Sequence, residues 1–507
     1  MKDWKRTFGL AAMAIGVLVA IGAVVAVAGQ GSEASISTNV LVNPVGLISV
    51  NNSPTLVRDP QDADHLVVAH RIDRPGFSGL LEWSDDAGAS WTPTSLPLPP
   101  DTEVCAASPQ QLPCPFAPDV AFGPDGTLYV LYVSLEGRGN TPAALWLSTS
   151  TDGGRTLGAP VAIAGELTFQ PRLAVARDGT VHVVWLAADS VGLNQISGPA
   201  RVVAIRSTDG GRTFSAPVQV SDPGRERVGA ASPVVDSDGG LVVLYEDFTT
   251  DRRDFLGLQG PVAEDPFALV VSRSDDGGQS FTPGVVLESE LVPTRRFLVF
   301  LPEYPSLAIG ADDQLYVSWS DGRNADEDVF LRHSSDGGAT WDDAVMVNDN
   351  PVGDGTDQYL PRVAVAPNGR VDVLFYDRRS DPADVLTDVF LASADGPGEP
   401  FTNRRVSSQS FDSTVGPTFG PDYGTDFGTR LGLKSTDDEA HAAWTDTRLG
   451  DMNTGRQDVF AATVTVPSSG LLGAAVALVA LLGLGVGGLW LVRRRSSGAA
   501  PTDGAKS

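Results

Sequence analysis

The chain has 507 residues, and its 63 acidic residues outnumber its 36 lysines and arginines, which gives a formal net charge of −27. This length is sufficient for one large domain or for a few small ones. A surface so acidic argues against nucleic acids and anionic membrane surfaces as partners, because both would repel it.

The N-terminus carries a predicted export signal. A short basic start is followed by an apolar run from Phe8 to Ala28, and Ala26-Val27-Ala28 is a suitable cleavage triplet. This pattern is typical of a secretory signal peptide, and a run of this length also suits an uncleaved signal anchor. We therefore expect residues 1–28 to direct the chain out of the cytoplasm.

The two cysteines of the sequence, Cys105 and Cys114, stand in the short segment CAASPQQLPC. In an exported chain such a pair is expected to form a disulfide that staples its own loop. A metal site is the alternative, but it needs further ligands nearby and none is apparent. The sequence therefore predicts a disulfide and no metal site.

A short phrase, STDGGRTF at 207–214, recurs along most of the chain. Its pattern is Ser-x-Asp-x-Gly-x-Thr/Ser-aromatic, with Leu157 in place of the aromatic residue once. An element that returns at intervals of 57–67 residues indicates a repeat architecture. The aspartates of the six copies, the last of which is decayed, are Asp86, Asp152, Asp209, Asp276, Asp336 and Asp395.

The phrase has the composition of a tight turn between two strands. Ser and Asp side chains accept hydrogen bonds from nearby backbone, and glycine adopts positive φ without a steric penalty. The phrase resembles the Asp box of sialidases and of other bacterial-neuraminidase-repeat β-propellers. This resemblance implies an all-β propeller, and it says little about function because enzymes and non-enzymes share the box.

A second phrase precedes the boxes, and it consists of Pro-x-apolar-Ala-apolar, a turn, and an apolar strand that ends in an aromatic residue. Examples are FQPRLAVARDGTVHVVW at 169–185 and YLPRVAVAPNGRVDVLFY at 359–376. The period-two alternation around Asp-Gly and Asn-Gly turns predicts hairpins. The two phrases together define seven four-stranded units, with six, the usual number in sialidases, as the alternative.

The seventh unit ends after its third strand, QDVFAATV at 457–464. The N-terminal segment 39–54 reads like a fourth strand that leads into the next unit. We therefore expect this segment to complete the last blade, because ring closure removes exposed sheet edges. The predicted propeller spans residues 35–466.

An apolar stretch without charges, residues 471–492, follows the propeller directly. As a helix it would rise about 33 Å, enough to cross a bilayer. Arg493, Arg494 and Arg495 come next, and basic residues favour the cytoplasmic side, so the tail at 493–507 is predicted to lie inside. The sequence thus predicts a single-pass cell-membrane protein with an extracellular propeller.

The residue after the proline of the second phrase is predicted to lie near the mouth of the central channel. Three arginines at equivalent positions would suit a carboxylate, since each guanidinium offers a planar fork of donors. Sialidases are similar in that three arginines bind the carboxylate of sialic acid. Internal ion pairs are the alternative. The aligned residues are Asp119, Arg172, Ser306, Arg362 and, with one residue inserted in the turn, Arg430; the three arginines are the predicted substrate-binding residues.

The resemblance to sialidases also implies a tyrosine nucleophile, a glutamate that activates it and an aspartate acid/base. A neutral tyrosine suits attack beside a carboxylate, because an anionic nucleophile would be repelled. Packing between blades is the alternative for each tyrosine. The candidates are Tyr423, Tyr359 and Tyr304 as nucleophile, Glu246 and Glu303 as base, and Asp119 as acid/base.

One feature of sialidases is missing. The Phe/Tyr-Arg-Ile-Pro phrase that usually carries the first arginine is not found, and the nearest string, HRID at 70–73, stands at the end of a second strand. This departure counts against a true sialidase.

Three loops repeat Asp-x-Arg followed by a later aspartate, as in WSDGRNADEDVF at 319–330. Ion pairs that fix these loops are the simplest interpretation. A calcium site is the weaker alternative, because the spacing is not that of an EF-hand. No other cofactor is predicted. The pairs are Asp321–Arg323, Asp377–Arg379 and Asp446–Arg448, and the later aspartates are Asp328, Asp388 and Asp458.

Two functions remain from these observations. The first is a sialidase-like exo-glycosidase, or another carbohydrate-active ectodomain, that recognises an acidic sugar at the channel mouth. The second is a non-catalytic propeller that binds a glycan or a protein through the same face. A purely structural surface protein would need no ring of arginines.

Overall fold

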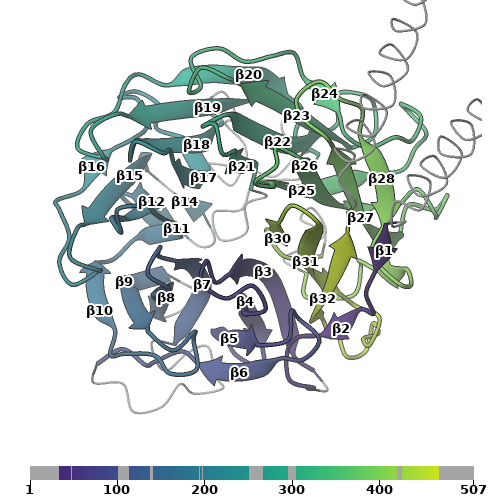
Figure 1. Ribbon diagram of the computed structural model, residues 1–507, viewed down its shortest axis with the longest axis horizontal. Helices are drawn as coiled ribbons and strands as arrows, with labels where there is room; N and C mark the ends of the chain where they lie inside the picture. The colour runs from purple at the N-terminus through teal and green to yellow at the C-terminus, as the bar shows by residue number, and fades with distance from the viewer. Residues whose placement is uncertain are drawn as a thin grey trace, which may run out of the picture. The chain divides into compact units, whose positions relative to one another are not determined.

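The computed structural model describes residues 34–46, 48–100, 114–136, 141–192, 195–196, 198–249, 266–294, 304–418 and 425–466. These residues form seven β-sheets arranged as blades around a common centre, and no helix occurs among them (Figure 1). The predicted seven-bladed, all-β propeller is therefore confirmed.

Each blade consists of four antiparallel strands that follow one another from the centre to the rim. A small hairpin, β13 (Val191–Gly192) and β14 (Gln195–Ile196), lies in one loop of the third blade. The strands of the first four blades are β3 (Val50–Arg58), β4 (Leu66–Arg74), β5 (Ser78–Ser84) and β6 (Thr92–Ser95); β7 (Pro115–Phe122), β8 (Leu128–Glu136), β9 (Thr141–Ser150) and β10 (Val161–Ala164); β11 (Thr168–Val175), β12 (Val181–Ala188), β15 (Ala200–Ser207) and β16 (Val218–Gln219); and β17 (Val228–Val235), β18 (Leu241–Asp247), β19 (Phe267–Ser274) and β20 (Val285–Leu291).

The fifth and sixth blades repeat this order, and the sixth has an additional short strand, β29 (Phe411–Asp412), paired with its third strand. The strands of these blades are β21 (Ser306–Ile309), β22 (Leu315–Asp321), β23 (Asp328–Ser334) and β24 (Val345–Met346); and β25 (Gln358–Val365), β26 (Val371–Asp377), β27 (Leu386–Ala394) and β28 (Thr402–Arg405).

The seventh blade is built from both ends of the propeller. It takes β30 (Gly432–Ser435), β31 (Glu439–Asp446) and β32 (Asp458–Thr465) from the C-terminal part, whereas β1 (Ser35–Ile36) and β2 (Val40–Leu41) pair with β32 from the N-terminal part. Val40 lies opposite Ala461, and β2 runs antiparallel to β32. The predicted closure by the N-terminal strand is confirmed.

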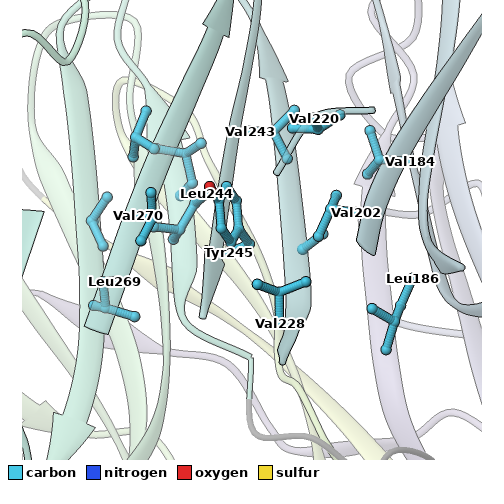
Figure 2. Packing of buried hydrophobic residues seen from close by; sticks show 14 of the residues in the cluster. Val184, Leu186, Val202, Val220, Val228, Val243, Leu244, Tyr245, Leu269 and Val270 are labelled. Atoms are coloured by element: carbon cyan, nitrogen blue, oxygen red, sulfur yellow. The ribbon is translucent and has the colours of Figure 1, made fainter. Parts of the chain in front are cut away.

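Apolar side chains fill the spaces between neighbouring blades. Between the third and fourth blades, Val184 and Leu186 of β12 face Val228 of β17 and the side chains of β18 (Figure 2). Tyr245 of β18 has no exposed surface. Because each fully buried valine or leucine contributes about 1.5–3 kcal/mol, these contacts hold adjacent blades together.

The Asp boxes are turns between the third and fourth strands, as predicted. In the second blade, Ser150 Oγ donates to Asp152 Oδ1 at 2.7 Å, and Gly154 N donates to Ser150 Oγ at 2.8 Å. Asp152 also accepts hydrogen bonds from the backbone N and the hydroxyl of Thr156, at 2.9 and 2.6 Å. The same bonds recur around Asp86, Asp209, Asp276 and Asp336.

Antiparallel order places the loops of a blade at two opposite ends. The Asp boxes share one end with the turns between first and second strands, and we call this end the box face. The connections into the inner strands and the loops between second and third strands lie at the other end, which we call the mouth face. The boxes are therefore remote from the loops that surround the channel mouth.

Candidate functional site

A bulge near the start of the inner strands sets which side chain faces the channel. In five inner strands the pairing register shifts, and one residue inside the shift has a φ of 51–57°. A bulge bends its strand and re-aims side chains, and positive φ outside glycine is strained and frequent at functional sites. The residues with positive φ are Ser53, Ala117, Gln170, Ala230 and Leu360.

Two residues after this point in these five strands, and at the first residue of β21 in the fifth blade, one residue stands opposite the fourth residue of the second strand. Arg172, for example, pairs with Val184, and Arg362 pairs with Leu374. We call these the ring positions. They are Thr55, Asp119, Arg172, Ser232, Ser306 and Arg362.

The seventh blade differs from the other six at this position. The pairing of β30 with β31 begins at Gly432, opposite Ala443, so Arg430 lies just before the paired residues, two positions after Gly428, whose φ is also positive. The long side chain of Arg430 still reaches the ring, because its Nε donates to Thr55 Oγ1 at 2.9 Å. Its Nη2 also donates to the backbone oxygen of Pro118 at 2.7 Å.

Consecutive blades are connected through these side chains. Thr55 Oγ1 donates to Asp119 Oδ1 at 3.0 Å, and Arg172 Nη1 lies 3.4 Å from the same oxygen. The other oxygen of Asp119 accepts the backbone N–H of Leu173 at 3.0 Å. The predicted alternative of an internal ion pair with Asp119 is thus observed for Arg172, but this pair is long and leaves most of the guanidinium free.

Three guanidinium groups share the neighbourhood of Asp119. Burial, together with the positive charge of Arg172, lowers the pKa of Arg362 to about 10 and the pKa of Arg430 to about 9, whereas Asp119 opposes both shifts. Arg362 and Arg430 therefore remain cationic at neutral pH, as arginine does in proteins generally. The cluster therefore carries more positive than negative charge, in a chain whose formal net charge is −27.

Two of these arginines have unused donors. Arg172 is only 6% exposed, and its Nε and Nη1 have no hydrogen-bond partner. Arg362 is half-buried and donates no hydrogen bond to the described part of the chain. Buried donors without acceptors cost free energy that a bound anion would recover.

Tyr304 is the predicted nucleophile candidate that lies at this cluster. The guanidinium carbon of Arg172 lies 5.4 Å from the centroid of its ring, and burial raises the pKa of the Tyr304 hydroxyl to about 12 although Arg172 and Arg430 oppose the shift. Tyr304 N donates to Thr429 O at 3.4 Å. The phenol is therefore neutral at physiological pH and close to the arginines.

Arg71 belongs to the site, although the sequence places it at the end of a second strand and does not predict it there. It does lie on the second strand of its blade, β4, as expected for the string HRID, yet it lines a cavity of about 50 Å³ together with Tyr304 and Arg430. Arg71 forms buried ion pairs with Asp73 and Asp426. Burial raises the pKa of Asp426 to about 6. A cavity of this size accepts a carboxylate-sized group rather than a whole sugar ring.

The sequence contained a signal for Thr55 that was not used. Thr55 directly follows Pro54, as Asp119, Arg172, Ser306 and Arg362 follow their prolines. Arg71 had no such signal, because only the folded ring brings β4 of the first blade beside Arg430.

The other predicted catalytic residues have different surroundings. Tyr359 is buried, its hydroxyl lies 3.2 Å from Thr387 Oγ1, and its ring packs 5.2 Å from that of Tyr376. Glu246 lies on β18, opposite Gly229 of the inner strand. Tyr423 and Glu303 lie outside the described residues. The contacts of Tyr359 are those of a side chain packed within its own blade, and its catalytic role stays a prediction.

The Asp-x-Arg loops contain the predicted ion pairs. Arg323 Nε donates to Asp321 at 2.8 Å, and its guanidinium carbon stacks 4.7 Å from the ring centroid of Phe330. The same arrangement occurs in the next two blades, with Asp377, Arg379 and Phe390, and with Asp446, Arg448 and Phe460.

The later aspartates of these loops also have protein partners. Asp328 accepts hydrogen bonds from Asn324 and Asn348. Asp388 pairs with Arg405, and Asp458 pairs with Arg456. Within the described ranges, no three His, Cys, Asp or Glu side chains gather as metal ligands. The calcium alternative gains no support from these contacts.

Several predictions concern residues outside the described ranges. Cys114 is buried, but Cys105 is not described, so the disulfide stays a prediction. Residues 1–28, 471–492 and 493–507, predicted as signal, membrane helix and tail, are not described either. In the part of the chain that is described, no helix is long and apolar enough to cross a membrane.

The fold and the repeated boxes place the molecule among the Asp-box propellers. Residues 41–317, more than half of the chain, match the family of the BNR repeat-like domain, and the chain belongs to this family. The sequence matches no curated protein.

Solved structures share the architecture at low identity. A Hadza microbial sialidase is 18% identical, with 64% of this chain and 63% of that chain covered and a TM-score of 0.42. An α-L-arabinanase from Penicillium chrysogenum, complexed with arabinobiose, is 16% identical, with 72% and 95% covered and a TM-score of 0.41. An ulvan lyase is 11% identical, with 85% and 95% covered and a TM-score of 0.49. These likenesses concern the fold alone.

Proposed function

We propose that this propeller recognises the carboxylate of an acidic sugar at its channel mouth. The observation that carries the proposal is the buried guanidinium of Arg172, whose Nε and Nη1 lack acceptors while Arg362 stands nearby without a hydrogen bond to the described residues. Hydrogen bonds between guanidinium and carboxylate are charge-assisted and about twice as strong as neutral ones. A carboxylate that enters the cluster would accept hydrogen bonds from these donors and reduce the repulsion among the arginines.

The residues at the site suit a sugar acid better than a small inorganic anion. Tyr304 presents an aromatic surface, and the neighbouring Arg172 supplies donors that have no hydrogen-bond partner. Sugar rings need both apolar contact and polar partners. The cavity of about 50 Å³ beside Arg71 would admit only the group that projects from the ring.

The sugar's carboxylate can be tested directly by calorimetry on the full-length chain. Glucuronic acid or sialic acid should bind, whereas glucose and the methyl ester of the same acid should bind at least about tenfold more weakly, since they lack the charge. Equal binding of the acid and its ester would refute carboxylate recognition. Arg155→Met is the matched control, because this arginine is exposed and lies in an Asp box.

For catalysis, we propose Tyr304 rather than Tyr359 as the nucleophile of a sialidase-like glycosidase. Tyr304 is neutral and adjacent to the arginines, so a bound carboxylate would not repel it. Tyr304→Phe should abolish turnover of a fluorogenic sialoside while the affinity for the free acid stays within about twofold of the wild type.

A non-catalytic binding protein is the second candidate, and the surroundings of Asp119 favour it. Both oxygens of this predicted acid/base accept hydrogen bonds, from Thr55 and from the backbone of Leu173. A general acid must instead reach the leaving group of the substrate. Binding of acids without turnover on any of a panel of acidic glycosides would support this candidate.

The cell-surface location is part of the proposal. It rests on the apolar residues 471–492 and on the three arginines that follow them. External protease added to intact cells should remove the propeller while an epitope placed after Arg495 stays protected. Protection of both parts would contradict the proposed orientation.

A further inference from the structure

The decayed sixth Asp box leaves a space that the complete boxes fill. In the complete boxes of the second to fifth blades, the second glycine sits against the preceding blade. A Cβ added to Gly154 would lie 2.9 Å from Leu81 Cδ2, and one added to Gly211 would lie 2.5 Å from Leu147 Cδ2. These boxes therefore pack directly against the neighbouring blade.

In the sixth blade the phrase reads SADGPGEPF, and its turn lacks this contact. A Cβ added to Gly396 or to Gly398 would have no atom within 4 Å. The turn thus does not pack onto the fifth blade at these glycines, and a cavity of about 300 Å³ lies between it and the strands β23 and β24. This volume is at the lower end of the range for ligand pockets.

The cavity combines aromatic walls with carboxylates. Tyr316 and Phe401 line it, and so do the carboxylate residues Asp342, Asp343 and Glu399. His333 lies within 2.9 Å of Asp342 and packs against the ring of Tyr316. No lysine or arginine occurs among the described lining residues, so the negative charge is not neutralised from within the cavity.

We propose that this cavity, on the box face and apart from the arginine cluster, binds an arginine side chain of a partner polypeptide. The aliphatic part of an arginine packs on apolar surface, and its guanidinium stacks on aromatic rings and pairs with carboxylates. Phe401, which is half-buried, supplies the ring, and Asp343 and Glu399, which are exposed, supply the charge. Val345, 44% exposed at the cavity edge, offers an apolar contact for the residue next to the arginine.

The test is calorimetry of the full-length chain with the capped tripeptide Leu-Arg-Leu. The arginine peptide should bind. The same peptide with neutral citrulline in place of arginine should bind more weakly, by a factor of up to about five, as expected for the loss of exposed ion pairs. Asp343→Asn combined with Glu399→Gln should reduce arginine-peptide binding to the level of the citrulline peptide.

The matched control removes two charges elsewhere on the box face. Asp437→Asn with Asp438→Asn lies in an exposed turn of the seventh blade and should leave peptide binding unchanged. Val345→Lys provides a second variant, because its ammonium group would occupy the carboxylates and block the peptide. Equal binding of the arginine and citrulline peptides, or an equal loss in the control variant, would overturn the proposal.

Discussion

Charged groups at the two ends of the propeller have opposite surroundings. At the box face, Asp336 accepts hydrogen bonds from the hydroxyl and the backbone N–H of Thr340 and from Ser334, and the Thr340 hydroxyl is the main reason why its pKa falls to about 2. At the mouth, Arg362 is half-buried beside another arginine, and its removal from water is the main reason why its pKa falls to about 10. The folded structure thus stabilises the charge of Asp336 and destabilises the charge of Arg362.

This difference distinguishes the Asp boxes, which stabilise the fold, from the arginine cluster, which we propose binds a ligand. A charge that its own turn satisfies contributes to folding and leaves nothing for a ligand to bind. A charge that the fold leaves without acceptors costs stability, and such a cost persists where function requires it. The variants below test this contrast, from the largest expected effect to the smallest.

The largest effect is expected on ligand binding at the mouth. Arg172→Met combined with Arg362→Met should cost about 3–6 kcal/mol of binding energy for a sugar acid, because two charge-assisted contacts are lost. Calorimetric titration with sialic acid or glucuronic acid measures the change. Asp152→Ala at the box face is the control and should leave the dissociation constant unaltered. An equal loss of affinity in both variants would contradict a specific role of the two arginines in binding.

The next effect concerns a histidine that is an exception at the box face. His182 is buried with both ring nitrogens unpartnered, and burial, assisted by Arg206, lowers its pKa to about 4. Between pH 6.5 and 4 only the unfolded chain gains this proton, so the free energy of unfolding should fall with falling pH, on the order of 3 kcal/mol for this residue.

Urea unfolding at several pH values measures this loss. His182→Leu should flatten the decline between pH 6.5 and 4, although His441, whose pKa burial also lowers to about 4, will retain its own share. Val184→Ala loosens the same core without removing a titratable group and should keep the wild-type slope. If the pH dependence of the free energy of unfolding is unchanged in His182→Leu, the loss of stability at low pH does not come from His182.

A smaller effect is expected from a single Asp box. Asp152→Ala removes the acceptor for Ser150 and for both donors of Thr156. The free energy of unfolding should fall by about 1–2 kcal/mol, as for the loss of a helix cap or a few turn hydrogen bonds. Chemical denaturation measures it, and Asp395→Ala in the decayed box should cost less.

The smallest effect has the opposite sign. Arg362→Leu should raise the free energy of unfolding by about 1 kcal/mol, because it removes a buried charge that the fold does not compensate. Arg430→Leu should instead destabilise by about 2 kcal/mol, since Thr55 and Pro118 lose their donor. Equal destabilisation by both substitutions would mean that the folded chain does stabilise the charge of Arg362, contrary to the proposed difference between the two ends of the propeller.

The sequence by itself determined the architecture. The Asp box is a local motif whose hydrogen bonds join residues at most four positions apart, so its composition is sufficient to identify it. Its recurrence predicted the blades, the missing fourth strand of the last blade predicted closure, and the alternation within the second phrase predicted the inner strands. Each of these features depends on neighbours along the chain.

Only the tertiary structure decided which side chains meet at the mouth. Arg430 and Thr55 are 375 positions apart and become neighbours because the ring closes. The local context of Arg71 gives no sign of its place at the site, and Arg430 lies before the paired residues of its strand yet reaches Thr55. The burial of Arg172 and the lack of a hydrogen-bond partner for its Nε and Nη1 depend on packing around the whole ring and have no counterpart in local sequence.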